Sequence, residues 1–295
     1  MSSDKSIKHP IIVLTGCTAS GKSSMALELA KQYKWPIINA DSKQVYKELS
    51  IGTDKPIADK IISDRHWIVS EVDHYLYGYV SLTEGYNVSR YQADVSSLLH
   101  NTTTTALMVG GTGLYIDAVT MGFQLPATTN DPEDLSDRSI EDLHSMLGKK
   151  TLALNPSDKM NRRRLIRLIE SSGMRGSKKE PLDHLYLVLD RTKEDLRRRS
   201  EQRIDEMFNN GLPEEAETLK ELICSKDGVN VIGYKEFREY FEGKISLIQV
   251  KQNILTHTRQ YAKRQRTWFR RRKDAIFIKN ISEARSQIEN FFNDR

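Results

Sequence analysis

The stretch Ile11–Ala30, IIVLTGCTASGKSSMALELA, constrains the fold more strongly than any other part of the chain. Within it, Gly16–Ser23 (GCTASGKS) fits the pattern G-x-x-x-x-G-K-[ST] of a phosphate-binding loop. The loop follows a short run of apolar β-formers, and a helical pattern begins directly after it. Because this strand–loop–helix order is the context that such a loop requires, we expect a phosphate site at the end of the first strand of an α/β sheet.

Such a loop binds phosphates through its backbone N–H groups, the N-terminus of the following helix and a few side chains. Successive backbone N–H groups point inward, and the N-terminus of the helix adds a partial positive charge. Lys22 brings a full charge to the outer phosphate, and the hydroxyl of Ser23 can hold Mg²⁺, the one cofactor that we expect. The residues expected to hold the phosphates are Gly16, Thr18, Ala19, Ser20, Gly21, Lys22, Ser23 and Ser24. The loop alone does not say whether these phosphates belong to ATP or to another carrier.

Four further apolar runs read as strands: Pro36–Asp41, His66–Asp73, Ala106–Tyr115 and His184–Asp190. Helical stretches separate them, and such alternation predicts a mostly parallel sheet with helices on both faces. We therefore expect a doubly wound α/β fold of the P-loop NTPase type.

The alternation lapses between residues 124 and 181, where few strand-like runs occur. We expect a core in two parts, 8–123 and 182–295, the second part ending in basic helices, interrupted by a small helical insertion at 124–181. The segments LPATTNDPEDLSD and SSGMRGSKKEP, which flank the insertion, are typical of linkers.

Composition limits the class of protein. The chain has 295 residues, of which 38% are hydrophobic and 29% charged, as in a soluble globular protein. No apolar run reaches the length of a membrane span, and the first ten residues lack the apolar segment of a secretory signal. The two cysteines, Cys17 and Cys224, form no C-x-x-C pair. We expect a reduced, cytoplasmic monomer without a membrane partner.

The formal net charge is +5, and the basic residues cluster. Lys159–Arg167 holds five Lys or Arg, and Lys251–Lys273 holds nine, with no acidic residue in either segment. In the second segment, basic residues at helical spacing form a ridge: Arg259, Lys263, Arg266 and Arg270. Such patches favour a nucleic-acid partner, although a solvated helix face would have the same composition.

Two more features lie at expected strand ends. Asp41 closes the second strand, where a carboxylate could hold Mg²⁺, accept a proton or cap the next helix. Ser42 and Gln44 have side chains that hydrogen-bond a purine edge. The turn GGTGLY, Gly110–Tyr115, is consistent with a close backbone approach to a ligand or with an ordinary structural turn.

Taken in order, GCTASGKSS, INADSKQVYKELSIGTDKP, VGGTGLYIDAV, RRRLIRLIE, RIDEMFNNGLPEE, VIGYKE and TRQYAKRQRTWFR closely resemble the tRNA dimethylallyltransferases. The resemblance runs from about Ile11 to Phe269, and DSKQVYKELSIGTDKP and TRQYAKRQRTWFR are its most diagnostic parts. It implies transfer of a C5 prenyl group from dimethylallyl diphosphate to the exocyclic amine of the adenosine just 3′ of the anticodon, with release of pyrophosphate. The loop would then hold a leaving group and not ATP.

The resemblance also implies roles for individual residues. Asp41 matches the general base, Thr112 a residue that contacts the diphosphate near the breaking bond, and Arg203 a diphosphate-binding arginine; Arg199 is a second candidate. The alternative for each arginine is an ordinary solvated residue. Contacts with tRNA through the anticodon stem-loop are implied for Asp41, Ser42, Lys43, Gln44, Arg163, Arg164, Arg167, Gly233, Tyr234 and Lys235. The ridge residues Arg259, Lys263 and Arg266 suit phosphate contacts.

The chain departs from the family pattern at a few points. Cys17 stands where the family usually has Pro, Asn230 stands where a basic residue often precedes GY, and the insertion is short. The chain lacks the C-terminal zinc finger of eukaryotic members, which favours the bacterial type. The alternatives are an isopentenyltransferase acting on free adenine nucleotide, an ATP-binding P-loop kinase or NTPase, and a non-catalytic RNA-binding protein.

Overall fold

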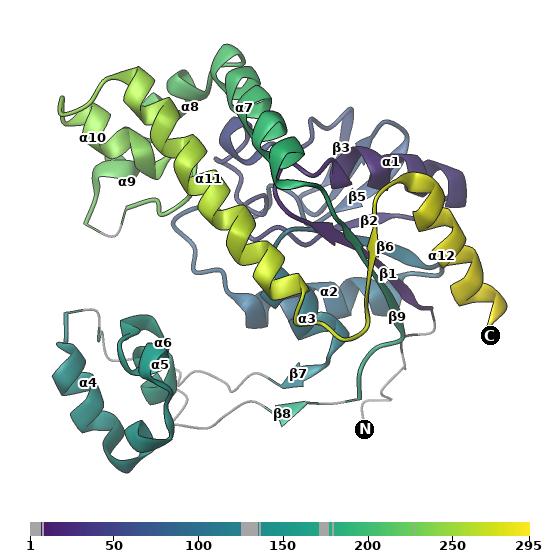
Figure 1. Cartoon of the computed structure of the whole chain (residues 1–295), viewed down its shortest axis with the longest axis horizontal. Coiled ribbons are helices and arrows are strands. Elements are labelled where there is room, and N and C mark those ends of the chain that lie inside the picture. Colours follow the sequence, from purple (N-terminus) through teal and green to yellow (C-terminus); the bar gives the residue numbers. More distant parts are fainter. Residues whose placement is uncertain are drawn as a thin grey trace. The chain divides into compact units, whose positions relative to one another are not determined.

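The computed structural model describes residues 7, 9–124, 135, 137–170, 177–178, 180–226 and 228–295 (Figure 1). These residues form two compact units. The larger comprises the described residues of Met1–Thr120 together with Leu182–Arg295, and the smaller those of Met121–Pro181. Residue 8, the expected start of the core, and most of the two expected linkers at 125–137 and 171–181 lie outside the described residues.

The larger unit is built on a sheet that contains eight described strands in the order β10-β9-β1-β6-β2-β5-β4-β3. The strands are β1 (Ile11–Gly16), β2 (Ile37–Asn39), β3 (Lys60–Ser63), β4 (His66–Val69), β5 (Val72–Tyr75), β6 (Ala106–Gly110), β9 (His184–Leu189) and β10 (Ala275–Ile278). Neighbours from β10 to β5 pair in parallel, whereas β4 and β3 add an antiparallel edge. The fold is therefore α/β with a mixed sheet, and the expected alternation of strands and helices is confirmed.

The run His66–Asp73 was expected to form one strand, and this prediction is wrong. The structure folds it into the β4–β5 hairpin, in which Val69 faces Val72 across a two-residue turn. Ser70 and Glu71 occupy this turn with φ of 48° and 67°. Two successive left-handed residues match the twist of a tight hairpin, and the turn lacks the glycine that usually signals one. Of the two hairpin strands, only β5 pairs with β2, in parallel.

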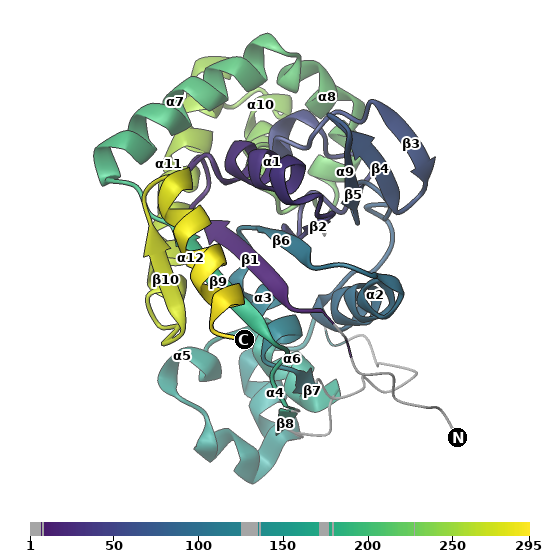
Figure 2. The same cartoon turned by 90° about the vertical axis from the view of Figure 1, so that its right-hand side faces the viewer.

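Helices cover both faces of the sheet (Figure 2). One face carries α1 (Lys22–Tyr33) and α12 (Ile281–Asn293), and the opposite face carries α2 (Val88–Asn101) and α3 (Gly113–Thr120). All six residues of β1 are buried, as expected for a strand that is covered on both sides. No helix in the described part of the chain is both long and apolar enough to cross a membrane.

A second core lies among the helices that follow β9. These elements are α7 (Lys193–Asn209), α8 (Leu212–Thr218), α9 (Lys220–Cys224), the 3₁₀ turn η3 (Lys235–Phe237), α10 (Arg238–Phe241) and α11 (Leu247–Phe269). Thr192 caps α7 by accepting a hydrogen bond from the backbone N–H of Asp195. The buried side chains include Leu49, Ile204, Tyr234, Phe237 and Ile254, so the core also holds the segment after β2. That segment contains the 3₁₀ turn η1 (Ile51–Thr53).

The smaller unit is mainly helical. It contains β7 (Phe123–Gln124), α4 (Ile140–Leu147), the 3₁₀ turn η2 (Gly148–Ala153), α5 (Pro156–Lys159), α6 (Arg162–Glu170) and β8 (Ser177–Lys178). Its own small core is formed by Leu135, Leu143, Leu147 and Leu165. Ser139 and Asp142 form a capping box that fixes the start of α4.

Candidate active site

The Gly-rich loop lies between β1 and α1. Gly21 directly precedes α1, and among the residues that the structure describes no side chain caps the first turn of this helix, so its N–H groups remain available to an anion. Two loop amides are already used within the protein. The N–H of Ser20 donates to the carbonyl of Cys17 at 3.1 Å, and that of Thr18 donates to Oε1 of Gln265 at 2.8 Å.

Gln265 on α11 fixes this loop to the β6–α3 turn. Its Nε2 donates to the carbonyl of Gly111 at 2.8 Å, and its side chain is buried. A Cβ at Gly111 would lie 2.3 Å from this Nε2, and one at Gly110 would lie 2.1 Å from the carbonyl carbon of Ala40. The two glycines are therefore required by close approach of α11 and of the end of β2. Gln265 is not among the site residues expected from the sequence, although it lies in the diagnostic TRQYAKRQRTWFR segment.

Asp41 is held rigidly after β2. Its N–H donates to Oδ1 of the buried Asn39 at 2.8 Å, and its own Oδ1 accepts the N–H of Lys43 at 2.9 Å. Thr112 buttresses the next residue, because its hydroxyl oxygen accepts the N–H of Ser42 at 3.0 Å. The carboxylate is thus oriented by its own turn and by a neighbouring strand end.

A single cavity of about 640 Å³ joins these parts of the larger unit. The loop contributes to its lining with Thr18, Ala19, Gly21, Lys22, Ser23 and Ser24. Of the other residues named from sequence, the lining includes Asp41, Ser42, Lys43, Gln44, Thr112, Arg199, Arg203, Gly233 and Lys235. Gly16 and Ser20 do not line it, and the side chain of Ser20 is fully buried.

The loop end of the cavity is cationic. Burial lowers the pKa of the Lys22 ammonium, and the charge of Arg203 lowers it further. The carboxylates of Asp41 and Asp54 act in the opposite direction. Arg203 reaches this end from α7, where its guanidinium lies 3.7 Å from a carboxylate oxygen of Asp54. This end is therefore suited to a polyanion such as a diphosphate.

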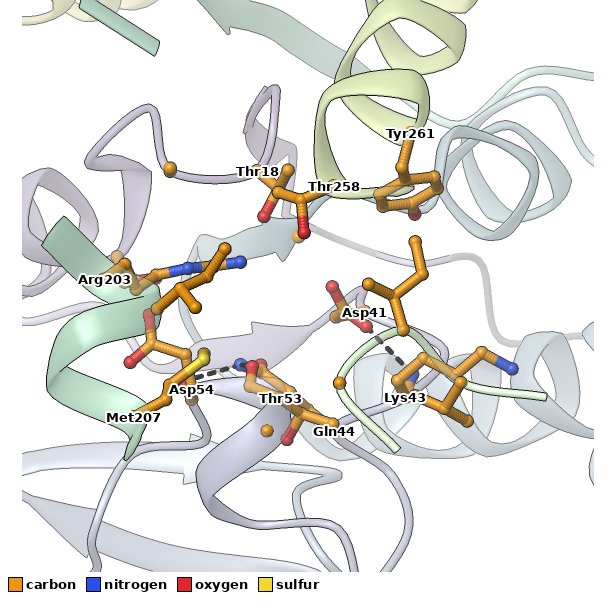
Figure 3. Close-up of a pocket in the computed structure, with 18 of the residues that line it drawn as sticks. Thr18, Asp41, Lys43, Gln44, Thr53, Asp54, Arg203, Met207, Thr258 and Tyr261 are labelled. Carbon is orange, nitrogen blue, oxygen red and sulfur yellow. Dashed lines mark hydrogen bonds and ion pairs between the residues drawn. The ribbon is translucent and has the colours of Figure 1, made fainter. Parts of the chain in front are cut away.

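α11 forms another wall of the cavity with Thr258 and Tyr261 (Figure 3), and Arg264 of the same helix also belongs to the lining. Tyr261 lies across from Asp41, and burial together with the charge of Asp41 raises the pKa of its phenol. The guanidinium of Arg264 lies 5.7 Å from the centre of the Tyr261 ring. Neither Tyr261 nor Arg264 is among the candidate residues named from the sequence, although both line the cavity.

The expected basic ridge of α11 is only partly exposed. Arg259 is exposed but pairs with Glu201 at 2.7 Å, and Lys263 is exposed. Arg266 turns inward: its guanidinium donates to the carbonyl of Arg191 and lies 3.5 Å from Asp190. It is therefore already engaged within the protein, and a phosphate contact by Arg266 has no support in this geometry.

Tyr234 also differs from expectation, because it is fully buried and cannot contact RNA directly in this structure. Its hydroxyl donates to Glu215 and accepts the N–H of Gly52 at 3.0 Å. Glu215 in turn accepts the N–H of Ile51 at 3.0 Å. Tyr234 therefore holds the η1 turn, while its neighbours Gly233 and Lys235 line the cavity.

The three arginines named in the insertion lie on α6 of the smaller unit. Arg163, Arg164 and Arg167 are all exposed, and Arg164 forms an ion pair with Asp158. Their contacts with tRNA stay a prediction.

A family model described as IPP transferase matches residues 44–272, which is most of the chain. The chain belongs to the IPP transferase family. A second family model, described as Isopentenyl transferase, matches residues 9–76. The resemblance drawn from the sequence motifs is thereby confirmed.

Individual members of the IPP transferase family align along nearly the whole chain. A protein named tRNA dimethylallyltransferase from Rippkaea orientalis is 38% identical, over 88% of this chain and 90% of its own length. One with the same name from Lactococcus lactis subsp. lactis is 35% identical, over 93% and 95%. The crystal structure of the full-length tRNA isopentenylpyrophosphate transferase from Bacillus halodurans is 29% identical, covers 97% of this chain and 96% of its own, and has a TM-score of 0.71.

Proposed function

We propose that the chain is a tRNA dimethylallyltransferase, which moves the dimethylallyl group of dimethylallyl diphosphate to N6 of the adenosine 3′-adjacent to the anticodon. The observation that carries the proposal is the single cavity with a cationic loop at one end and Asp41 at another wall. Relatives with the name tRNA dimethylallyltransferase support it across most of the chain.

The donor fits the cationic end. Lys22 and Arg203 line this end beside the first turn of α1, and together with the N–H groups of that turn they would receive a diphosphate. As the allylic C–O bond breaks, the electron pair stays on the departing pyrophosphate, and these groups stabilise the charge that develops there. The same interactions are weaker in the ground state, because the electron pair of the C–O bond is then still shared between the oxygen and the prenyl carbon.

The acceptor fits the wall that carries Asp41. The lone pair of the adenine amine is delocalised into the ring, so the amine is a poor nucleophile. Asp41 would accept its proton as the new N–C bond forms, and the Asx turn with Lys43 keeps the carboxylate fixed. Thr112, hydrogen-bonded to Ser42, would lie near the breaking bond. The target base must leave the anticodon-loop stack to reach this cavity.

Mg²⁺ fits the site as an ion held largely by the substrate. Ser23 is exposed at the start of α1 and lines the cavity. Among the described residues, no group of three or more His, Cys, Asp or Glu side chains could form an all-protein cage. Mg²⁺ commonly keeps waters and binds through one or two protein ligands plus phosphates. When bound, it would neutralise charge on the diphosphate.

The test is incubation of the purified protein with labelled dimethylallyl diphosphate, Mg²⁺ and either unmodified tRNA or AMP. We expect label on tRNA, and mass spectrometry of the nucleosides should find N6-dimethylallyladenosine from the anticodon loop. Label on AMP alone would instead support an isopentenyltransferase of free nucleotides. Rapid ATP turnover without a prenyl donor would support a kinase or NTPase.

A further inference from the structure

Asp54 is an acidic residue at the cationic end of the cavity, and the reaction itself assigns it no role. It follows the η1 turn, and its backbone is fixed: its N–H donates to the carbonyl of Ile51 at 3.0 Å, and its carbonyl accepts Nε2 of Gln44 at 2.9 Å. Its side chain is 60% exposed and points towards Arg203, whose side chain is 24% exposed (Figure 3).

The charges at this end explain why an acid is placed there. Without a donor, Lys22 and Arg203 face the same cavity and repel each other, and each is partly buried. Arg203 is also under-satisfied, because its Nε is buried and has no hydrogen-bond partner among the described residues. The carboxylate of Asp54, 3.7 Å from the guanidinium, offsets part of this cost.

A donor diphosphate would change the balance. It would bring several negative charges to the same guanidinium, so Asp54 would then lie beside an anion of its own sign. The ion pair of the donor-free protein and the proposed diphosphate contact therefore compete for Arg203.

We propose that Asp54 is a positioning residue that acts as an internal counter-ion: it holds Arg203 in place without the donor and releases it to the diphosphate. This inference rests on the proposed function. If Asp54 competes with the diphosphate for Arg203, it weakens the binding of the donor. For the same reason it favours release of the pyrophosphate product.

The substitution Asp54→Asn tests this inference with little risk to the fold. Asp54 has a φ of 56°, a left-handed conformation that Asn tolerates well, and its two backbone hydrogen bonds do not involve the carboxylate. Asp54→Gly is a second variant that suits the same backbone. The matched control is Glu206→Gln, since Glu206 lines the same cavity but its carboxylate accepts from Gln202 at 3.0 Å.

The measurement is calorimetric binding of inorganic pyrophosphate with Mg²⁺ to each variant, followed by KM and kcat for dimethylallyl diphosphate. The loss of one partly exposed ion pair predicts pyrophosphate binding about two- to five-fold tighter in Asp54→Asn and Asp54→Gly, with a lower donor KM. Glu206→Gln should change both quantities less.

The outcomes separate the two claims. If the wild-type protein does not bind pyrophosphate, the proposed function fails at its diphosphate site, and this inference falls with it. If the wild type binds but both Asp54 variants bind equally or more weakly, only the inference is overturned. If Glu206→Gln binds pyrophosphate as tightly as the Asp54 variants do, the inference is also overturned. The tighter binding would then follow from the loss of any negative charge in the cavity.

Discussion

Replacing Gln265 tests whether α11 controls the shape of the phosphate loop. Gln265→Leu removes the acceptor of the Thr18 N–H and the donor to the Gly111 carbonyl, both at 2.8 Å. Each buried polar group that loses its hydrogen-bond partner costs about 1–3 kcal/mol. Thr18 is partly exposed, so the cost for its N–H group is near the lower limit. We expect a loss of about 2–4 kcal/mol in the free energy of unfolding, or about 5–15 °C in Tm. Pyrophosphate binding should weaken as well, because the loop loses the hydrogen bond that links Thr18 to α11.

Gln265→Glu separates hydrogen bonding from packing. One carboxylate oxygen can still accept the Thr18 N–H, but the other would face the Gly111 carbonyl without a proton to donate. Lowering the pH should protonate the carboxyl and restore part of the lost stability. Gln260→Leu, at an exposed position of the same helix, is the control. The reasoning fails if Gln265→Leu has the same Tm as the control variant. It also fails if the stability of Gln265→Glu does not rise at low pH.

Three further predictions concern the chemistry, the RNA and pH. Asp41→Asn should lower kcat about 100-fold or more while pyrophosphate still binds, since Asn can keep the Asx turn with Lys43; near-normal turnover would exclude Asp41 as the base. Replacing the exposed Arg163 and Arg167 by Ala should weaken tRNA binding and reduce its salt slope by about 0.7–0.9 per lost phosphate contact, whereas Lys149→Ala should not. Burial lowers the pKa of Lys55 to about 8, so the native state binds fewer protons than the unfolded chain between pH 8 and about 10.4. The wild type should therefore gain stability relative to Lys55→Met as pH rises through this window in denaturant unfolding, and a constant difference would contradict the lowered pKa.

The parts of the fold that follow from local chemistry could be read from the sequence. β1, the loop and α1 are contiguous, and the apolar runs at β2 and β6 end in residues that line the cavity. The β4–β5 hairpin was missed because its turn uses Ser70 and Glu71, which carry no common turn signal. Helical periodicity identifies the side of a helix that is buried, and it does not identify the partner.

Two positions whose surroundings differ from the expectation share one physical cause. Tyr234 and Arg266 look like exposed contact residues because Tyr and Arg commonly are, yet each has partners distant in the chain. The hydroxyl of Tyr234 bonds to Gly52, 182 residues away, and the guanidinium of Arg266 bonds to Arg191, 75 residues away. Such pairings depend on the complete topology, so no local pattern can supply them.

The geometry of α11 explains why a phosphate loop can serve transfer to a base in this chain. Four residues of α11 lie on one side of the helix, because they are separated by three or four positions from one turn to the next: Thr258, Tyr261, Arg264 and Gln265. One rigid helix thus tethers the loop through Gln265, faces Asp41 through Tyr261 and reaches the cavity lining through Arg264. A change at Gln265 would therefore alter the distance between the phosphate loop and Asp41, even though Gln265 lies outside the cavity lining. It follows that Gln265→Leu should lower kcat as well as pyrophosphate affinity, whereas a tether that served stability alone would leave kcat unchanged below the unfolding transition.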